Sequence, residues 1–289
     1  MAGTVMDDAP GSPPAARPTT LPDSLHPRAK VVAEPKKTRR LRPWQQVDDA
    51  EAIAATFHKQ GFVIVEDVVD SATCDHLLIT INKTRDWLKS NKQGNMRNRQ
   101  KTRYSLNWRD WKFMSSWQYM LLEVLEGKVR CYLDAITGDD DSICIDRLGG
   151  DCVERGCLEP QDWHSDWSEL KIGGNGGHEV ALGISIAVTE VTEAMGPIAI
   201  MPADLEQVEA NAVACCMSKG SVLIRNIRVR HRGTANVSDV DRVLPGFTLL
   251  TRATLLLDHT PMQAMDLELR PTHMKRIPVW LRYNVMHSA

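Results

Sequence analysis

The densest group of chemically capable side chains is the segment 163–167, which reads WHSDW. In an extended strand, side chains at positions i and i+2 share a face, so His164 and Asp166 would offer an imidazole and a carboxylate to one point. Both groups are ligands for transition metals. The spacing is a weak signal by itself, because roughly one His-x-Asp is expected by chance in such a chain. The plain alternative is a surface hydrogen-bonded pair between two anchoring tryptophans, Trp163 and Trp167.

A second polar segment strengthens the metal interpretation. It reads HRGTANVSDVDR, runs from His231 to Arg242, follows an apolar run at 221–224 and precedes an apolar run at 243–251. His164, Asp166 and His231 would supply two imidazoles and one carboxylate to one face of an octahedron. Three positions would stay open, two for a bidentate keto acid and one for O2. Arg242 would pair with the far carboxylate of the keto acid.

Other pairs and clusters compete with these residues. His259 and Arg270 have the same spacing as His231 and Arg242, but the order of glycine turn, strand, His, Asn, Ser and Arg favours the earlier pair. The cysteines fit no common structural zinc pattern, which favours buried small side chains. The glycine-rich segment 173–177 lacks the flanking strand and helix of a phosphate loop, and we interpret it as a hairpin and candidate lid.

Hydrophobic periodicity predicts helices first and strands later. A helix is expected from about Val47 to Phe57 with Gly61 as its C-cap, then a buried strand over 62–65, a helix capped by Asp70 or Ser71, and a third helix over 117–133. After about residue 140, short apolar runs at 142–145, 180–188, 198–201, 221–224 and 243–251 are separated by glycine and proline turns, Gly149–Gly150 among them. The pattern predicts an α+β fold with helices packed beside one antiparallel sandwich or barrel.

Composition limits the remaining function classes. The chain has 289 residues, a formal net charge of −2 and seven cysteines without a CxxC pair, and it lacks a membrane-length apolar run. We therefore expect a cytoplasmic protein with no membrane and no nucleic acid as partner. Residues 1–43 hold eight of the fifteen prolines and no aromatic residue, which predicts a disordered tail before a single domain over 44–289.

One basic segment, residues 91–112, stands apart from this average. Its arginines and lysines interleave with Tyr104, Trp108 and Trp111. A solvated loop is the plain interpretation, and a site for an anionic substrate is the alternative. Within it, the stretch from Arg97 to Arg103 is a candidate for a second contact to the keto acid.

Four segments together resemble the phytanoyl-CoA dioxygenase family of iron(II)/2-oxoglutarate-dependent oxygenases. They are residues 61–65 (GFVIV), 163–167 (WHSDW), 193–202 (EAMGPIAIMP) and 231–242. The resemblance implies a double-stranded β-helix, or jelly-roll, core at about 141–258, with Fe(2+) on His164, Asp166 and His231. It also implies 2-oxoglutarate on Arg242 and Ser238, with O2 as the other co-substrate and Trp163 and Trp167 as walls of the substrate site.

The chain departs from the family pattern at two places. Ala203-Asp204-Leu205 follows Pro202 where Gly-Ser-His is usual, and VALGI at 180–184 stands where many members place an aromatic residue. Neither departure removes a ligand, and the presence of Asp166 favours hydroxylation over halogenation. We therefore expect an oxygenase that hydroxylates a C–H bond of a small organic substrate. The alternative is a catalytically silent barrel that binds a ligand or partner.

Overall fold

The computed structural model of the chain describes residues 49–91, 96–100, 102–107, 124, 127–138, 144–166 and 181–250. The predicted tail, Trp167, the glycine-rich segment 173–177, His259 and Arg270 lie outside these residues. The described helices are α1 (Ala50–Gln60), α2 (Ser71–Asn91) and α4 (Lys128–Thr137), with short 3-10 turns η2 (Glu193–Met195) and η3 (Glu209–Asn211). Within the described helices, none is long and apolar enough to cross a membrane.

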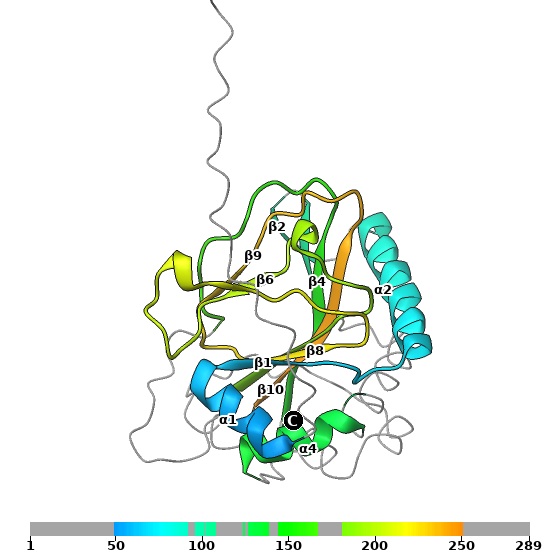
Figure 1. The fold of residues 1–289 in the computed structure, drawn as a ribbon. Helices are drawn as coiled ribbons and strands as arrows, with labels where there is room; N and C mark the ends of the chain where they lie inside the picture. Colours follow the sequence, from blue (N-terminus) through cyan, green and yellow to red (C-terminus); the bar gives the residue numbers. More distant parts are fainter. Residues whose placement is uncertain are drawn as a thin grey trace, which may run out of the picture. The chain divides into compact units, whose positions relative to one another are not determined.

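The strands form two antiparallel sheets (Figure 1). The larger sheet has the order β1-β8-β5-β10-β4-β3-β2 and the smaller one has the order β7-β6-β9. Their bounds are β1 (Phe62–Val65), β2 (Met96–Gln100), β3 (Arg103–Asn107), β4 (Cys144–Val153), β5 (Ala181–Ile186), β6 (Ile198–Ile200), β7 (Val213–Ala214), β8 (Val222–Asn226), β9 (His231–Gly233) and β10 (Arg242–Leu250). From β1 to β4 in this order, neighbouring strands are far apart in sequence, as expected of a jelly roll, whereas β4, β3 and β2 are consecutive strands.

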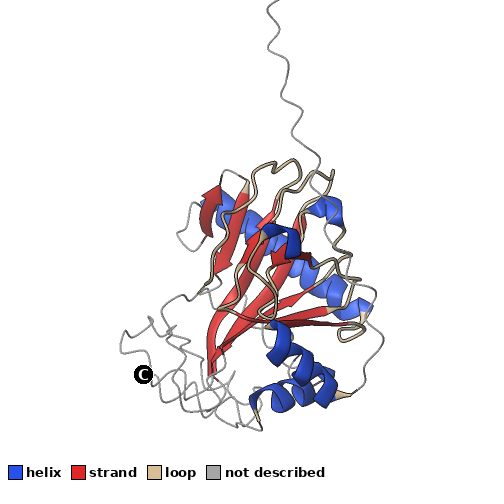
Figure 2. Ribbon diagram, turned by 60° about the vertical axis from the view of Figure 1, so that its left-hand side comes forward, coloured by secondary structure: helices blue, strands red, loops and turns tan. Residues whose placement is uncertain are grey.

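The larger sheet buries both of its faces. Alternate residues such as Val63, Leu182 and Ile224 join the core formed with the helices. Their neighbours Phe62, Leu223 and Leu244 join a second core with the smaller sheet. Figure 2 shows the helices beside the strands, and the predicted arrangement of helices against an antiparallel β unit is confirmed. The face toward the smaller sheet is the barrel interior.

Local sequence signals set the helix ends. Asp49 caps α1 by accepting a hydrogen bond from the Glu51 backbone N–H at 2.9 Å, and Gly61 ends the helix with a φ of 81°. Asp70 caps α2 by accepting from the Thr73 backbone N–H at 2.9 Å. The end of α1 at Gly61, the cap of α2 at Asp70 and strand β1 agree with the prediction, whereas α1 begins at Ala50 and not at about Val47. The start of the third predicted helix lies outside the described residues.

Two sequence interpretations are wrong. Gly149–Gly150 is not a turn but lies within β4, where a Cβ at Gly150 would collide with the Leu244 carbonyl and lie 2.8 Å from Pro245 Cα. Glycine serves close strand packing there, not chain reversal. The basic segment is also not simply a loop, because residues 96–107 supply the hairpin β2–β3, which extends the larger sheet.

Candidate metal centre

Backbone pairing brings the two distant segments of the predicted site together. The backbone N–H of His164 donates to the His231 carbonyl at 3.0 Å, and the N–H of His231 donates to the His164 carbonyl at 2.8 Å. The N–H of Asp166 donates to the Ile227 carbonyl at 3.0 Å. Because residues 164–166 form backbone hydrogen bonds to Ile227 and His231, the two histidine rings lie next to each other, with centroids 4.5 Å apart.

The hydrogen bonds of both histidines leave the same ring nitrogen free. Nδ1 lies 2.8 Å from the Asp162 carbonyl in His164 and 2.9 Å from the Val229 carbonyl in His231. A carbonyl only accepts, so Nδ1 carries the proton in each neutral ring and Nε2 presents its lone pair. The two backbone carbonyls thereby hold both imidazoles in the tautomer that a metal ion can bind.

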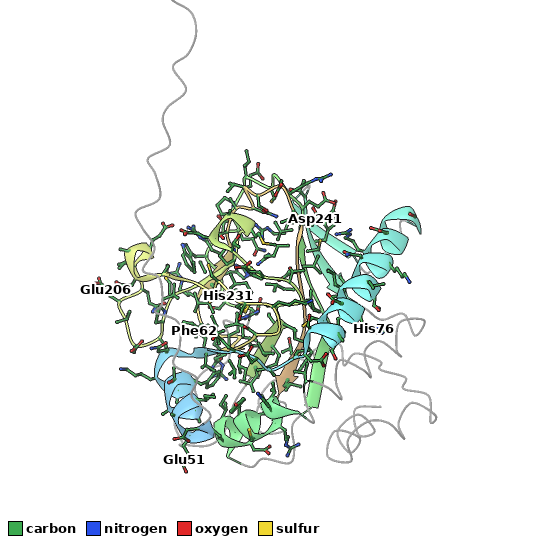
Figure 3. The ribbon with its side chains drawn as sticks, turned by 45° about the vertical axis from the view of Figure 1, so that its right-hand side comes forward. Glu51, Phe62, His76, Glu206, His231 and Asp241 are labelled. Carbon is green, nitrogen blue, oxygen red and sulfur yellow. The ribbon has the colours of Figure 1, made fainter. Side chains whose placement is uncertain are left out.

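The Asp166 carboxylate lies beside both free nitrogens. Its Oδ1 is 3.8 Å from His164 Nε2, and its Oδ2 is 3.5 Å from His231 Nε2. One ligand atom from each of the three residues lies within 4.8 Å of the others. In Figure 3, His231 lies amid packed side chains while the exposed Glu51 and Glu206 lie at the periphery. The three predicted ligands thus meet at one point, as a small coordination sphere requires.

Burial and the charges around the site keep Asp166 and His231 deprotonated. Burial raises the pKa of Asp166, but the Arg225 guanidinium at 2.7 Å, together with the two histidines, lowers it to about 2. Burial and Arg225 lower the pKa of His231 to about 3, against the opposing effect of Asp166. A metal ion at neutral pH therefore displaces no proton from either residue.

The lowered pKa of His231 predicts how the metal-free protein responds to acid. The unfolded ring takes up a proton below its ordinary pKa of 6.5, whereas the folded ring stays neutral until about pH 3. The free energy of unfolding therefore falls as the pH drops below about 6.5. The His231 ring should account for about 2 kcal/mol of this decrease between pH 7 and pH 5. His231→Gln should lack that part of the loss in urea unfolding at the two pH values. An equal loss in both proteins would show that the folded ring is protonated.

Arg242 is a buried cation with unused donors. Its side chain is 1% exposed, and its Nε and Nη1 have no hydrogen-bond partner among the described residues. Burial lowers its pKa to about 10, with Arg103 also lowering it and Asp151 opposing, so the guanidinium stays charged at neutral pH. A buried charge with free N–H groups is costly unless an anion pairs with it.

Side chains on three neighbouring strands of the larger sheet connect Arg242 to β9, the strand that carries His231. Arg242 and Arg103 both stand opposite Val153, so the three side chains lie on the same face of β10, β4 and β3. Arg103 Nη2 donates to the Thr234 carbonyl at 2.8 Å, just after β9, and its guanidinium occupies the space that a Cβ at Gly233 would take. Arg242 therefore lies in the interior near the strand that carries His231. Arg103 is 2% exposed, which a solvated basic loop would not have predicted.

The other predicted site residues have contacts of their own. The Ser238 hydroxyl donates to Asn236 Oδ1 at 2.7 Å and lies 3.1 Å from the Val240 carbonyl, so the bonds that the structure shows for it lie within its loop. The half-buried Trp163 packs with its ring centroid 4.6 Å from Arg232 Cζ. Arg232 follows His231 and Trp163 precedes His164, so this contact lies on the side of the strand pair away from the ligands. The roles of Ser238 and Trp163 at the co-substrate and substrate stay predictions, and Trp167 lies outside the described residues.

Solved structures show the same fold at low sequence identity. The epimerase SnoN, crystallised with Fe3+, alpha ketoglutarate and nogalamycin RO, has a TM-score of 0.54 and 15% identity, covering 70% of this chain and 83% of that one. The non-heme monooxygenase ThoJ, solved as a nickel complex, has a TM-score of 0.53 and 16% identity, covering 69% and 77%. AviO1 from Streptomyces viridochromogenes Tue57 has a TM-score of 0.56 and 13% identity, covering 72% and 98%.

A jelly-roll core with two histidines and one carboxylate at a common point defines a non-haem iron enzyme of the 2-oxoglutarate-dependent class. The sequence profile of the phytanoyl-CoA dioxygenase (PhyH) family matches residues 57–244, more than half of the chain. The chain belongs to this family and is therefore an oxidoreductase of the iron- and 2-oxoglutarate-dependent type. No curated protein sequence matches it significantly.

One residue at the site escaped the sequence analysis. Arg225 of β8 donates from Nη2 to Asp166 Oδ2 at 2.7 Å. It directly follows the predicted apolar run 221–224, but its partner lies in a segment about 60 residues earlier in the chain. The available signal was an arginine one residue beyond an otherwise apolar run, which is also typical of an ordinary strand end.

Proposed function

We propose that the chain oxidises a C–H bond of a small organic substrate, with iron(II) on His164, Asp166 and His231, and that the oxidation is a hydroxylation. Iron bound there, together with 2-oxoglutarate, supplies the oxidising power as O2 is consumed and the keto acid becomes succinate and CO2. The observation that carries this proposal is the meeting of three ligand atoms, one each from His164, Asp166 and His231, within 4.8 Å in a PhyH-family fold.

The residues present fit both groups. Each histidine offers Nε2 because a backbone carbonyl occupies Nδ1, which suits a divalent metal ion. Arg242 offers two N–H groups that have no partner among the described residues, which suits the distal carboxylate of 2-oxoglutarate. Charge-assisted hydrogen bonds from the guanidinium to that carboxylate would offset the cost of the buried charge. We therefore assign Arg242, and not the loop-bonded Ser238, as the main determinant of co-substrate binding.

The surrounding chain has a clear task in this reaction. The backbone bridge between residues 164 and 231 fixes the distance between the two imidazoles, and the apolar residues of the second core, such as Phe62, Ile200 and Leu223, exclude water from the interior. The crystal structure of SnoN contains nogalamycin RO together with Fe3+ and alpha ketoglutarate. A small organic molecule next to the metal is the corresponding proposal for this chain.

Release of CO2 from carboxyl-labelled 2-oxoglutarate tests the proposed reaction. We expect release that requires iron(II) and O2 and that rises when a fraction of small metabolites supplies the substrate. Equimolar succinate and an added oxygen atom in the product, detected by mass spectrometry with ¹⁸O2, would identify hydroxylation. Keto-acid conversion without oxygen incorporation would contradict hydroxylation and favour another oxidation, such as desaturation or epimerisation. A folded, iron-loaded protein that never decarboxylates the keto acid would instead be the silent barrel.

A further inference from the structure

The guanidinium of Arg225 lies against the carboxylate of Asp166, which is one of the proposed iron ligands. It lies in β8, its side chain is 12% exposed, and its Nη2 is 2.7 Å from Asp166 Oδ2. Of the partners that the structure gives the Asp166 carboxylate among the described residues, the other two are His164 and His231, which share the proposed metal. Arg225 is thus the one partner in this set that does not itself coordinate the metal.

The Arg225 guanidinium lies in a space that exists because residue 183 is a glycine and has no side chain. We call this space the seat of Arg225. Gly183 in β5 stands directly opposite Arg225 in the sheet register. A Cβ on Gly183 would lie 3.1 Å from Arg225 Cζ and 3.3 Å from its Nε, which is tighter than ordinary contact. Gly183 lies in the stretch 180–184 that departs from the aromatic pattern of the family. The glycine leaves the space in which the guanidinium lies close against β5.

We propose that Arg225 is a positioning residue that holds the Asp166 carboxylate in its metal-binding orientation, with Gly183 as its seat. The Asp166 side chain is 31% exposed, and Arg225 anchors one of its two oxygens with a charge-assisted hydrogen bond. Without this anchor the carboxylate would rotate between the site and solvent. The inference rests on the proposed iron site and adds a residue to it.

Two physical effects of Arg225 on a bound metal have opposite signs. Its positive charge repels a divalent cation, so removal of the charge alone would strengthen metal binding. Its hydrogen bond orients the Asp166 carboxylate, so removal of this bond would weaken metal binding. The loss of a group that hydrogen-bonds a metal ligand costs about 10–100-fold in metal affinity. The sign of the change therefore separates positioning from simple electrostatics.

Titration with Co(II), followed by its visible d–d absorption, tests the inference without turnover. We expect Arg225→Met to bind Co(II) about 10–100-fold more weakly than the wild type and to show altered d–d bands in its bound fraction. Arg225→Lys, which keeps the charge but loses the planar fork, should fall between them. A substitution that only lowered stability would reduce the folded fraction and leave the spectrum of the bound fraction unchanged.

Arg85→Met is the matched control. The Arg85 side chain is 13% exposed and pairs with Asp241 at 3.1 Å, so it resembles Arg225 in burial and charge, but it lies on α2 and does not contact the ligand set. Its Co(II) affinity, measured without 2-oxoglutarate, should equal that of the wild type. Equal or tighter binding by Arg225→Met would overturn the positioning role, whereas a wild type that binds no Co(II) would overturn the proposed metal site as well.

Gly183→Ala tests the seat independently. The added methyl group should displace the guanidinium and weaken Co(II) binding in the wild type. It should have little effect in Arg225→Met, whose flexible end can move away. Equal losses in the two backgrounds would show that Gly183 acts without Arg225 and would remove the seat from the proposal. Arg225→Lys keeps a cation in the site, so it decides the positioning role even if Arg225→Met fails to fold: weaker Co(II) binding than in the wild type supports the role, and equal binding overturns it.

Discussion

Asp166→Ala should lose substrate-dependent succinate formation by at least about 100-fold, because even outer-shell losses at metal sites cost 10–100-fold and this residue is a proposed ligand. The protein should stay folded, since the segment 164–166 is held by backbone hydrogen bonds to His231 and Ile227 that the substitution leaves intact. Succinate is measured with saturating iron(II), and the fold is checked by circular dichroism.

Glu190→Ala provides the control for loss of an acidic side chain. Glu190 is exposed and lies in the loop after β5, outside the proposed site, so its removal should change turnover by less than twofold to threefold. Undiminished succinate formation by Asp166→Ala would show that Asp166 is not an iron ligand. Partial rescue of Asp166→Ala by added formate would support the ligand assignment, because a small carboxylate could enter the vacated position.

Arg242→Ala should raise the 2-oxoglutarate concentration needed for half-maximal turnover by about 100-fold, because two charge-assisted hydrogen bonds to the distal carboxylate are worth about 3 kcal/mol. Co(II) or iron(II) affinity without the keto acid should change much less, since Arg242 is not among the ligand atoms that meet near His231. Measurement of both quantities on the same protein separates co-substrate binding from metal binding.

Arg242→Lys guards against a folding defect, because Arg242 is 1% exposed and alanine would leave a cavity. The lysine keeps a charge but loses the bidentate fork, so its 2-oxoglutarate requirement should lie between those of the wild type and alanine variants. An unchanged requirement in both variants would remove Arg242 from the co-substrate site. Arg270, the competing arginine, would then be the next candidate.

The proposed metal ligands could be picked out from the sequence because their signals are local. His164 and Asp166 follow from the i, i+2 alternation of an extended segment, and His231 follows from the polar segment that ends at Arg242. Strand β1, the end of α1 and the start of α2 were likewise predictable from buried apolar periodicity, from Gly61 and from the capping side chain of Asp70.

The remaining features depend on contacts that no local pattern encodes. The hairpin β2–β3 is rich in arginine and asparagine, and only its pairing with β4 makes Arg103 an interior residue. The sequence does not distinguish Gly150 from a glycine in a turn, yet Gly150 lies within β4, where it allows the backbone of Leu244 to approach closely. Arg225 pairs with Asp166 only because the segment 164–166 folds back onto the end of β8. Strand propensity does not predict this contact between distant parts of the chain.

Anaerobic addition of iron(II) and then 2-oxoglutarate tests the central claim most directly. If His164, Asp166 and His231 hold iron with adjacent positions open, the chelated keto acid should give a weak metal-to-ligand band near ~500 nm. The band should appear in the wild type and be lost in His231→Ala at equal protein concentration. A folded, iron-loaded wild-type protein that gives no such band with saturating 2-oxoglutarate would contradict the account.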